Sequence, residues 1–223
     1  MNRLLLLGLV GIIILTLSAC QQASEMDASA HSTANMQERV WTEEDRAYLL
    51  EHLDRTKQEL VAATDNLTAE QWYFKPDASA WSIAEIVEHL GLIEAFYFRD
   101  FLYGQYSPER RDLVDEVMQN DEALLAYAGD PSTANAAMYS SPMGRFESGE
   151  DLMDYFMQYR DQVLDLIETT ESDFRLHYAY RAPGSGIWTA RDLHQYGLTL
   201  IAHTERHTNQ LNRNKSAAGY PGN

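Results

Sequence analysis

The sequence contains little cysteine, proline and glycine for its length. Its 223 residues include one cysteine, so the chain cannot form an internal disulfide or a cysteine-rich zinc or iron–sulfur site. Any metal ion must therefore be held by histidine and carboxylate. Six prolines and 12 glycines are too few for a collagenous or low-complexity chain, and a hydrophobic content of 45% places the protein among the globular ones.

Basic residues are also scarce. The chain has 17 Lys and Arg against 34 Asp and Glu, which gives a formal net charge of −17. A surface this acidic repels a phosphate backbone, so we expect no nucleic-acid partner. The length suits one domain of ordinary size, and nothing in the composition decides between a monomer and a homodimer.

No hydrophobic run is long enough to cross a bilayer. The longest, from Leu4 to Leu17, has fourteen residues, fewer than the roughly 20 that a spanning helix needs. Such a run just after Arg3 is typical of a signal peptide. The sequence Leu17-Ser18-Ala19-Cys20 resembles the lipobox of bacterial lipoproteins, in which the chain is cut before the cysteine and lipid is attached to it. A secreted protein with an incidental cysteine is the alternative.

These features predict how the chain is divided. Residues 1–19 are expected to be a lipoprotein signal peptide, and residues 20–40, rich in short polar side chains and alanine, a disordered tether. Lipid on Cys20 would attach the protein to a membrane of the bacterial cell envelope. Gln21 after the cysteine favours the outer membrane if the cell is Gram-negative. Residues 41–215 are predicted to form the folded domain, and residues 216–223 a disordered tail.

Apolar residues at helical spacing predict four principal helices in this domain. Helix-capping patterns at Thr42 and Ser82 indicate helices over about 42–64 and 82–102. A third periodic segment spans 152–167, and a last helix is predicted to begin after a cap at Thr189 and to reach Leu211. The segment 108–127 is predicted to be an extra helix, and the turn-rich segment 129–146 a long crossover. No alternating strand pattern exceeds four residues. The fold class is therefore predicted as all-α, a four-helix bundle with a long crossover between helices two and three.

Three histidines are predicted to face the interior of this bundle. His203 and His207 are four residues apart, on the same helical stripe as Leu200, so they lie one above the other. His89 follows Ile86 by three residues on the second helix, which also directs it inward. Buried imidazoles need partners for both nitrogens, and a shared metal ion would provide one for each. Three separate core histidines, each hydrogen-bonded to a buried carbonyl or tyrosine, are the alternative.

Two sequence blocks resemble those of the DinB-like family of four-helix proteins. The first is Trp81-Ser82-Ile83-Ala84-Glu85-Ile86-Val87-Glu88-His89-Leu90, and the second is Ala202-His203-Thr204-Glu205-Arg206-His207-Thr208-Asn209-Gln210-Leu211. The resemblance covers about 41–213. It implies that His89, His203 and His207 form a triad that binds a divalent metal ion, zinc or nickel.

The resemblance also implies a function. A metal-dependent hydrolase or group transferase is expected, which activates water or a small-molecule substrate. Some branches of the family transfer low-molecular-weight thiols, which are cytoplasmic, so an envelope location favours hydrolysis. The alternative is an envelope-anchored module that binds a metal or ligand without catalysis, and a fourth protein ligand would favour it. No general base is evident in the sequence.

Three further features are predicted to surround the triad. Glu85, one turn before His89, is placed to orient that ring. His177, in an irregular stretch, is a candidate polar contact at the mouth of the site. Residues 139–146 of the crossover are expected to pack beside the histidines and to shape access to them.

Overall fold

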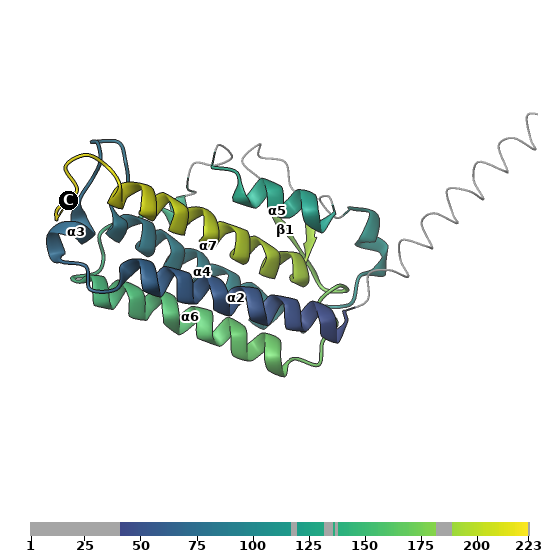
Figure 1. Cartoon of the computed structure of the whole chain (residues 1–223). Helices are drawn as coiled ribbons and strands as arrows, with labels where there is room; N and C mark the ends of the chain where they lie inside the picture. Colours follow the sequence, from purple (N-terminus) through teal and green to yellow (C-terminus); the bar gives the residue numbers. More distant parts are fainter. Residues whose placement is uncertain (1–40, 117–119, 132–135, 137, 182–188, 223) are drawn as a thin grey trace, which may run out of the picture. The chain divides into compact units, whose positions relative to one another are not determined.

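The computed structural model describes residues 41–116, 120–131, 136, 138–181 and 189–222, which all belong to a compact unit that begins at Trp41. Four long helices dominate it (Figure 1). They are α2 (Glu43–Thr64), α4 (Ile83–Gly104), α6 (Gly149–Thr169) and α7 (Leu193–Lys215). The predicted all-α four-helix bundle is thus confirmed. None of the helices in the described residues is long and apolar enough to cross a membrane.

The helices begin where the sequence places capping residues. The side chain of Thr42 accepts a hydrogen bond from the Asp45 backbone, and Asp45 returns one to Thr42, a capping box that opens α2. The same reciprocal pair joins Ser82 and Glu85 at the start of α4. The short helix α3 (Ala69–Tyr73) has its own capping box, so these starts are encoded locally.

The four helices form a ring in which each packs against two others. Helix α2 contacts α6 and α7, and α4 contacts the same two. Leu49 of α2 lies against Gly197 of α7, and Lys215 Nζ donates to the carbonyl of Ala63 at 2.8 Å. Residue numbers rise together along this pair, so α2 and α7 are parallel.

Helices α4 and α6 are parallel as well. Gly91 of α4 lies against Tyr155 of α6, and one turn further on Glu94 pairs with Arg160. Parallel neighbours cannot be joined by a short loop, because the chain must first return along the whole bundle. This topology explains the long crossover between α4 and α6 that the turn-rich sequence predicts.

The crossover holds more irregular structure than the sequence suggests. The single extra helix predicted over 108–127 is instead a 3₁₀ helix, η1 (Arg111–Glu116), followed by α5 (Asp121–Gly129), which packs on α7. Asn120 accounts for the break, because its side chain caps α5 by accepting from the Ala123 backbone at 2.8 Å. A second 3₁₀ turn, η2 (Met138–Ser140), lies against α4.

Two short strands precede the last helix. Strand β1 (Tyr178–Arg181) pairs antiparallel with β2 (Thr189–Asp192). The predicted cap at Thr189 is therefore wrong. Asp192 caps α7 by accepting from the Gln195 backbone at 2.7 Å, so the helix begins at Leu193.

A buried polar layer lies between two apolar clusters in the bundle core. Arg160 at its centre is fully buried, and its Nε donates to Glu94 at 3.1 Å. Its Nη1 donates to the Leu53 carbonyl at 2.7 Å and to the Thr56 hydroxyl at 2.9 Å. Its Nη2 donates to the Thr204 hydroxyl at 2.9 Å. All four long helices thus meet at one guanidinium.

Residues 216–222 pack on the domain, whereas the sequence predicts a disordered tail from residue 216. Within residues 216–222, Tyr220 is 5% exposed and its ring lies edge-on to Phe74, with centroids 5.4 Å apart. The Gln71 side chain donates to the Pro221 carbonyl at 3.0 Å. One buried aromatic offsets the ordering of a short polar segment, a contact that composition alone does not reveal.

Candidate metal centre

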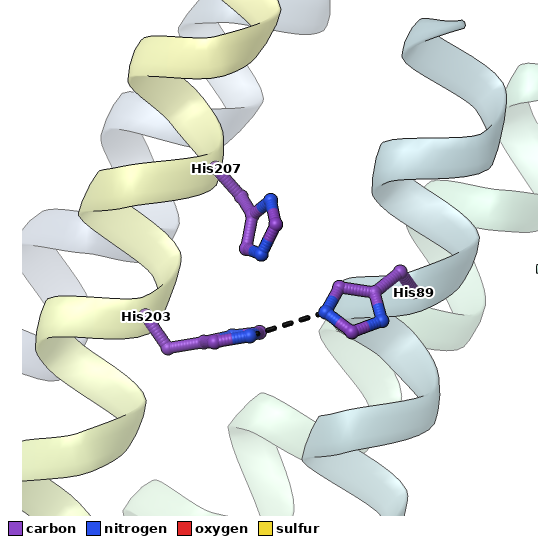
Figure 2. A group of neighbouring side chains, drawn as sticks. All are labelled: His89, His203 and His207. Carbon is purple, nitrogen blue, oxygen red and sulfur yellow. Dashed lines mark hydrogen bonds between the residues drawn. The ribbon is translucent and has the colours of Figure 1, made fainter. Parts of the chain in front are cut away.

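His89, His203 and His207 converge in the bundle (Figure 2). One ligand nitrogen from each lies within 4.8 Å of the other two, and the Nε2 atoms of His89 and His203 are 3.1 Å apart. Three nitrogens bound to one tetrahedral ion lie about 3.3 Å apart. Within the described part of the chain, these three residues are the only cluster of His, Cys, Asp or Glu with this geometry. The triad implied by the resemblance is thus assembled in space.

Two helices of opposite direction carry the three rings. His203 and His207 lie one turn apart on α7, and His89 faces them from α4. Asn214 near the end of α7 donates to the Trp81 carbonyl just before α4 at 2.6 Å, which fixes the two helices at this level. The Trp81 ring flanks the site, 5.0 Å from the His89 ring and 6.2 Å from that of His207.

Hydrogen bonds at Nδ1 keep Nε2 unprotonated on two of the rings. His89 Nδ1 is 2.7 Å from the Ser140 carbonyl, which only accepts, so this nitrogen carries the proton. His207 Nδ1 is 2.8 Å from Gln210 Oε1, which fixes the same tautomer. Metal ligation by histidine commonly uses such a partner on the other nitrogen.

His203 is held differently. Its Nδ1 is buried without a hydrogen-bond partner among the described residues, and its Nε2 faces that of His89. A shared ion would satisfy all three Nε2 atoms, so the residues fit a metal.

Hydrogen bonds hold part of the crossover beside His89. Residues 139–146 pack there as the sequence predicts, with the Ser140 carbonyl on the ring. The neighbouring Glu88 is 2% exposed, and its carboxylate accepts from the Gly144 backbone at 2.8 Å and from Arg145 Nε at 3.1 Å. Burial alone would raise the pKa of Glu88, but these hydrogen bonds hold it below its ordinary value, so the carboxylate stays charged.

All three imidazoles are neutral at physiological pH. Burial lowers the pKa of His89 to about 4 and that of His207 to about 3, and the guanidinium of Arg206 lowers both further. Burial also lowers the pKa of His203, followed by the charges of the other two rings. Three neutral rings present lone pairs rather than protons to an incoming cation.

These shifts predict an acid-sensitive apoprotein. His89 and His207 have an ordinary pKa of 6.5 and folded values of about 4 and about 3, so the unfolded chain binds more protons between these limits. The free energy of unfolding should be full above pH 6.5 and fall as the pH drops toward about 4. Urea unfolding across this range, compared with a variant in which the three histidines are glutamine, measures the effect. Parallel pH profiles for the two proteins would contradict it.

Two predicted neighbours of the triad have other roles. The Glu85 carboxylate pairs with Lys75 at 2.7 Å and accepts from the Ser82 backbone at 2.7 Å, so it caps α4 instead of orienting His89. The His177 carbonyl accepts from the backbone of Leu193, the first residue of α7 and ten residues before His203, and its Nδ1 is 3.2 Å from the Ser107 hydroxyl. Neither residue contacts the triad.

The residues that do contact the rings escape sequence reasoning. Gln210 lies three residues after His207, a spacing that helical geometry could have revealed. Ser140 acts through its backbone, which carries no signature in the sequence. Arg206, adjacent to His207 in the chain, places Nη2 3.1 Å from His207 Nε2.

Fold and site together define a helical bundle with an internal histidine triad. The model of the DinB superfamily matches residues 52–211, and the chain belongs to this superfamily. No curated protein matches the sequence. Among solved structures, the bundle is similar to YfiT from Bacillus subtilis, described as a probable metal-dependent hydrolase with an unusual four-helix bundle topology. The TM-score is 0.54 at 14% identity, over 80% of this chain and 90% of YfiT. At this identity the likeness concerns the fold.

Proposed function

We propose that this protein is a metal-dependent hydrolase whose divalent ion, zinc or nickel, is held by His89, His203 and His207. The observation that carries the proposal is the convergence of three neutral imidazoles, two of them fixed with Nε2 unprotonated by Ser140 and Gln210. YfiT, which has a similar fold, is described as a probable metal-dependent hydrolase, and this is consistent with the proposed function.

The ligand set suits both the metal and the reaction. Imidazole nitrogen is a preferred ligand of zinc and nickel. Three protein ligands with a further position for water or substrate are typical of catalytic zinc, whereas a fourth protein ligand is typical of structural zinc. Among the described residues the cluster contains three ligands and no fourth. An ion there would supply Lewis-acid chemistry toward a substrate oxygen or water.

Metal analysis followed by an activity screen tests the proposal. The purified chain is expected to retain about one divalent ion per molecule, matching one triad. After chelation and reloading with zinc, nickel, cobalt or manganese, it is screened against carboxylic esters, amides, lactones and phosphate esters. Turnover should require the metal and disappear in a variant with alanine at all three histidines.

Two outcomes would contradict the proposal in different ways. A wild-type chain that binds no divalent ion would reject the metal site itself. A chain that binds one ion yet hydrolyses no member of these classes would reject hydrolysis and leave the metal-binding module as the function. The histidine-free variant controls for a contaminating hydrolase, because its purification is identical.

We further propose that the mature protein is anchored in the cell envelope by lipid on Cys20. These residues lie outside the described part of the chain, so the support is the lipobox-like segment Leu17–Cys20 and the absence of any other cysteine. Cys20→Ala should abolish lipidation and move the protein from the membrane to the soluble fraction. Mass spectrometry of the mature native protein is the measurement, and an unmodified Cys20 would contradict the proposal.

A further inference from the structure

Arg206 lies beside the histidine triad, and no carboxylate of the described residues hydrogen-bonds to its guanidinium. It is half-buried on α7, between the two histidines of that helix. Its Nη1 donates to the Asp130 carbonyl at 3.2 Å, and its Nη2 to His207 Nε2 at 3.1 Å. Its Nε is buried and has no hydrogen-bond partner among the described residues. No described carboxylate lies within ion-pair distance of it, and burial lowers the pKa of Arg206, an effect that outweighs the charge of Asp130, which favours the charged form.

Two other buried arginines of the same domain, Arg160 and Arg175, are neutralised by carboxylates. Arg160 uses Nε and Nη2, the two nitrogens on one side of its guanidinium, to hold the Glu94 carboxylate. Arg175 lies 2.9 Å from Asp121 and 3.0 Å from Asp45. In a chain with twice as many acidic as basic residues, Arg206 is left with these same two nitrogens lacking a carboxylate. The burial of a charge that Asp130 offsets only in part is unfavourable, and an anionic ligand would offset the rest.

The contact between Arg206 and His207 cannot coexist with a bound metal. Neutral His207 has one lone pair, on Nε2, and Arg206 Nη2 donates to it. Metal ligation would use the same lone pair, and the ion would repel the guanidinium. Arg206 Nη2 must then leave His207 and, together with the unpartnered Nε, needs another acceptor. Two adjacent cationic groups favour an anion.

We propose that Arg206 recognises an oxyanion of the substrate, a carboxylate or a phosphate, through Nε and Nη2. This inference rests on the proposed function, because it assigns a substrate class to the same site. Paired N–H groups on one edge of a guanidinium match two oxygens of such an anion, a geometry that lysine does not offer. The Arg160–Glu94 pair shows that geometry within this protein.

Anion binding to the cobalt-loaded full chain tests the inference without a known substrate. Acetate and inorganic phosphate are titrated separately, and their affinities are read from the visible absorption of cobalt. Arg206→Gln should weaken the preferred anion by about 10- to 100-fold, the range expected for lost charge-assisted hydrogen bonds. Metal affinity should stay equal or rise, because His207 Nε2 no longer has a competing donor. If Arg206→Gln weakens acetate binding more, the substrate anion is a carboxylate; if it weakens phosphate binding more, the anion is a phosphate.

Arg213→Gln is the matched control. Arg213 is exposed near the end of α7, and its charge also lowers the pKa of His207, so the control removes a similar charge without touching the site. It should leave anion affinity within about 2-fold. Arg206→Lys keeps the charge and should still lose most of the affinity; it also carries the test if Arg206→Gln fails to fold.

The inference and the proposed function fail in distinguishable ways. A wild-type chain that takes up no cobalt rejects the metal site. If wild type and Arg206→Gln bind cobalt and have equal affinities for both anions, Arg206 is not the anion-binding group. Loss of cobalt in Arg206→Gln would also overturn the inference, because Arg206 would then support the metal ligands.

Discussion

Replacing His203 with alanine is expected to lower zinc affinity by more than about 100-fold, since loss of an outer hydrogen-bond partner already costs about 10- to 100-fold. His203 Nε2 lies 3.1 Å from His89 Nε2, and removing this ring leaves only two of the three histidine ligands. His89→Ala should have the same effect. Gln210→Ala, which removes only the partner of His207 Nδ1, should cost about 10-fold. Competition with a chromogenic chelator measures all three affinities.

His52→Ala is the control for this series. His52 lies on α2, where it contacts the ring of Tyr48 and the guanidinium of Arg55 rather than the triad. Its zinc affinity should equal that of the wild type. If the variant lacking all three triad histidines retained wild-type metal content, the site would be rejected and three separate core histidines would remain as the explanation.

Local chemistry explains why much of the bundle is predictable from the sequence. The caps at Thr42 and Ser82 satisfy backbone donors within their own turns, so the helix starts depend on no distant residue. The triad is predictable for a similar reason. His203 and His207 share the apolar stripe of one helix, and His89 shares that of another. A bundle has only one interior toward which both stripes can turn.

The errors of sequence reasoning lie where distant contacts decide the structure. The pattern of Thr189 and Asp192 resembles a capping box. Thr189 instead pairs with Arg181 in the two-stranded sheet, so the helix cap is Asp192. Glu85 has the spacing to reach His89, yet Lys75 and the Ser82 backbone occupy its carboxylate. The partner of His89 is a backbone carbonyl 51 residues away in the chain.

Arg160→Met is expected to destabilise the bundle by about 3–5 kcal/mol, because it leaves the buried Glu94 carboxylate without its counter-charge. Glu94 is 1% exposed, so bulk water would do little to screen its charge. Helix α6 would also lose its contacts with α2, through the Leu53 carbonyl and Thr56, and with α7, through Thr204. The free energy of unfolding in urea is the measurement. A loss below about 1 kcal/mol would show that the pair behaves like an exposed one.

Two companion variants separate lost charge balance from lost packing. The double variant Arg160→Met with Glu94→Leu should recover much of the stability, because it leaves no buried charge unpaired. Asp161→Asn, which breaks the exposed pair with Lys57 at 2.8 Å, should change the free energy of unfolding by less than about 1 kcal/mol.

Arg160→Met should lower the free energy of metal binding by less than the free energy of unfolding. The Thr204 hydroxyl still donates to the Leu200 carbonyl at 2.8 Å, which holds the turn that carries His203. If instead the double variant were stable but unable to bind metal, the polar layer would serve to align His203 with His89 rather than to stabilise the fold.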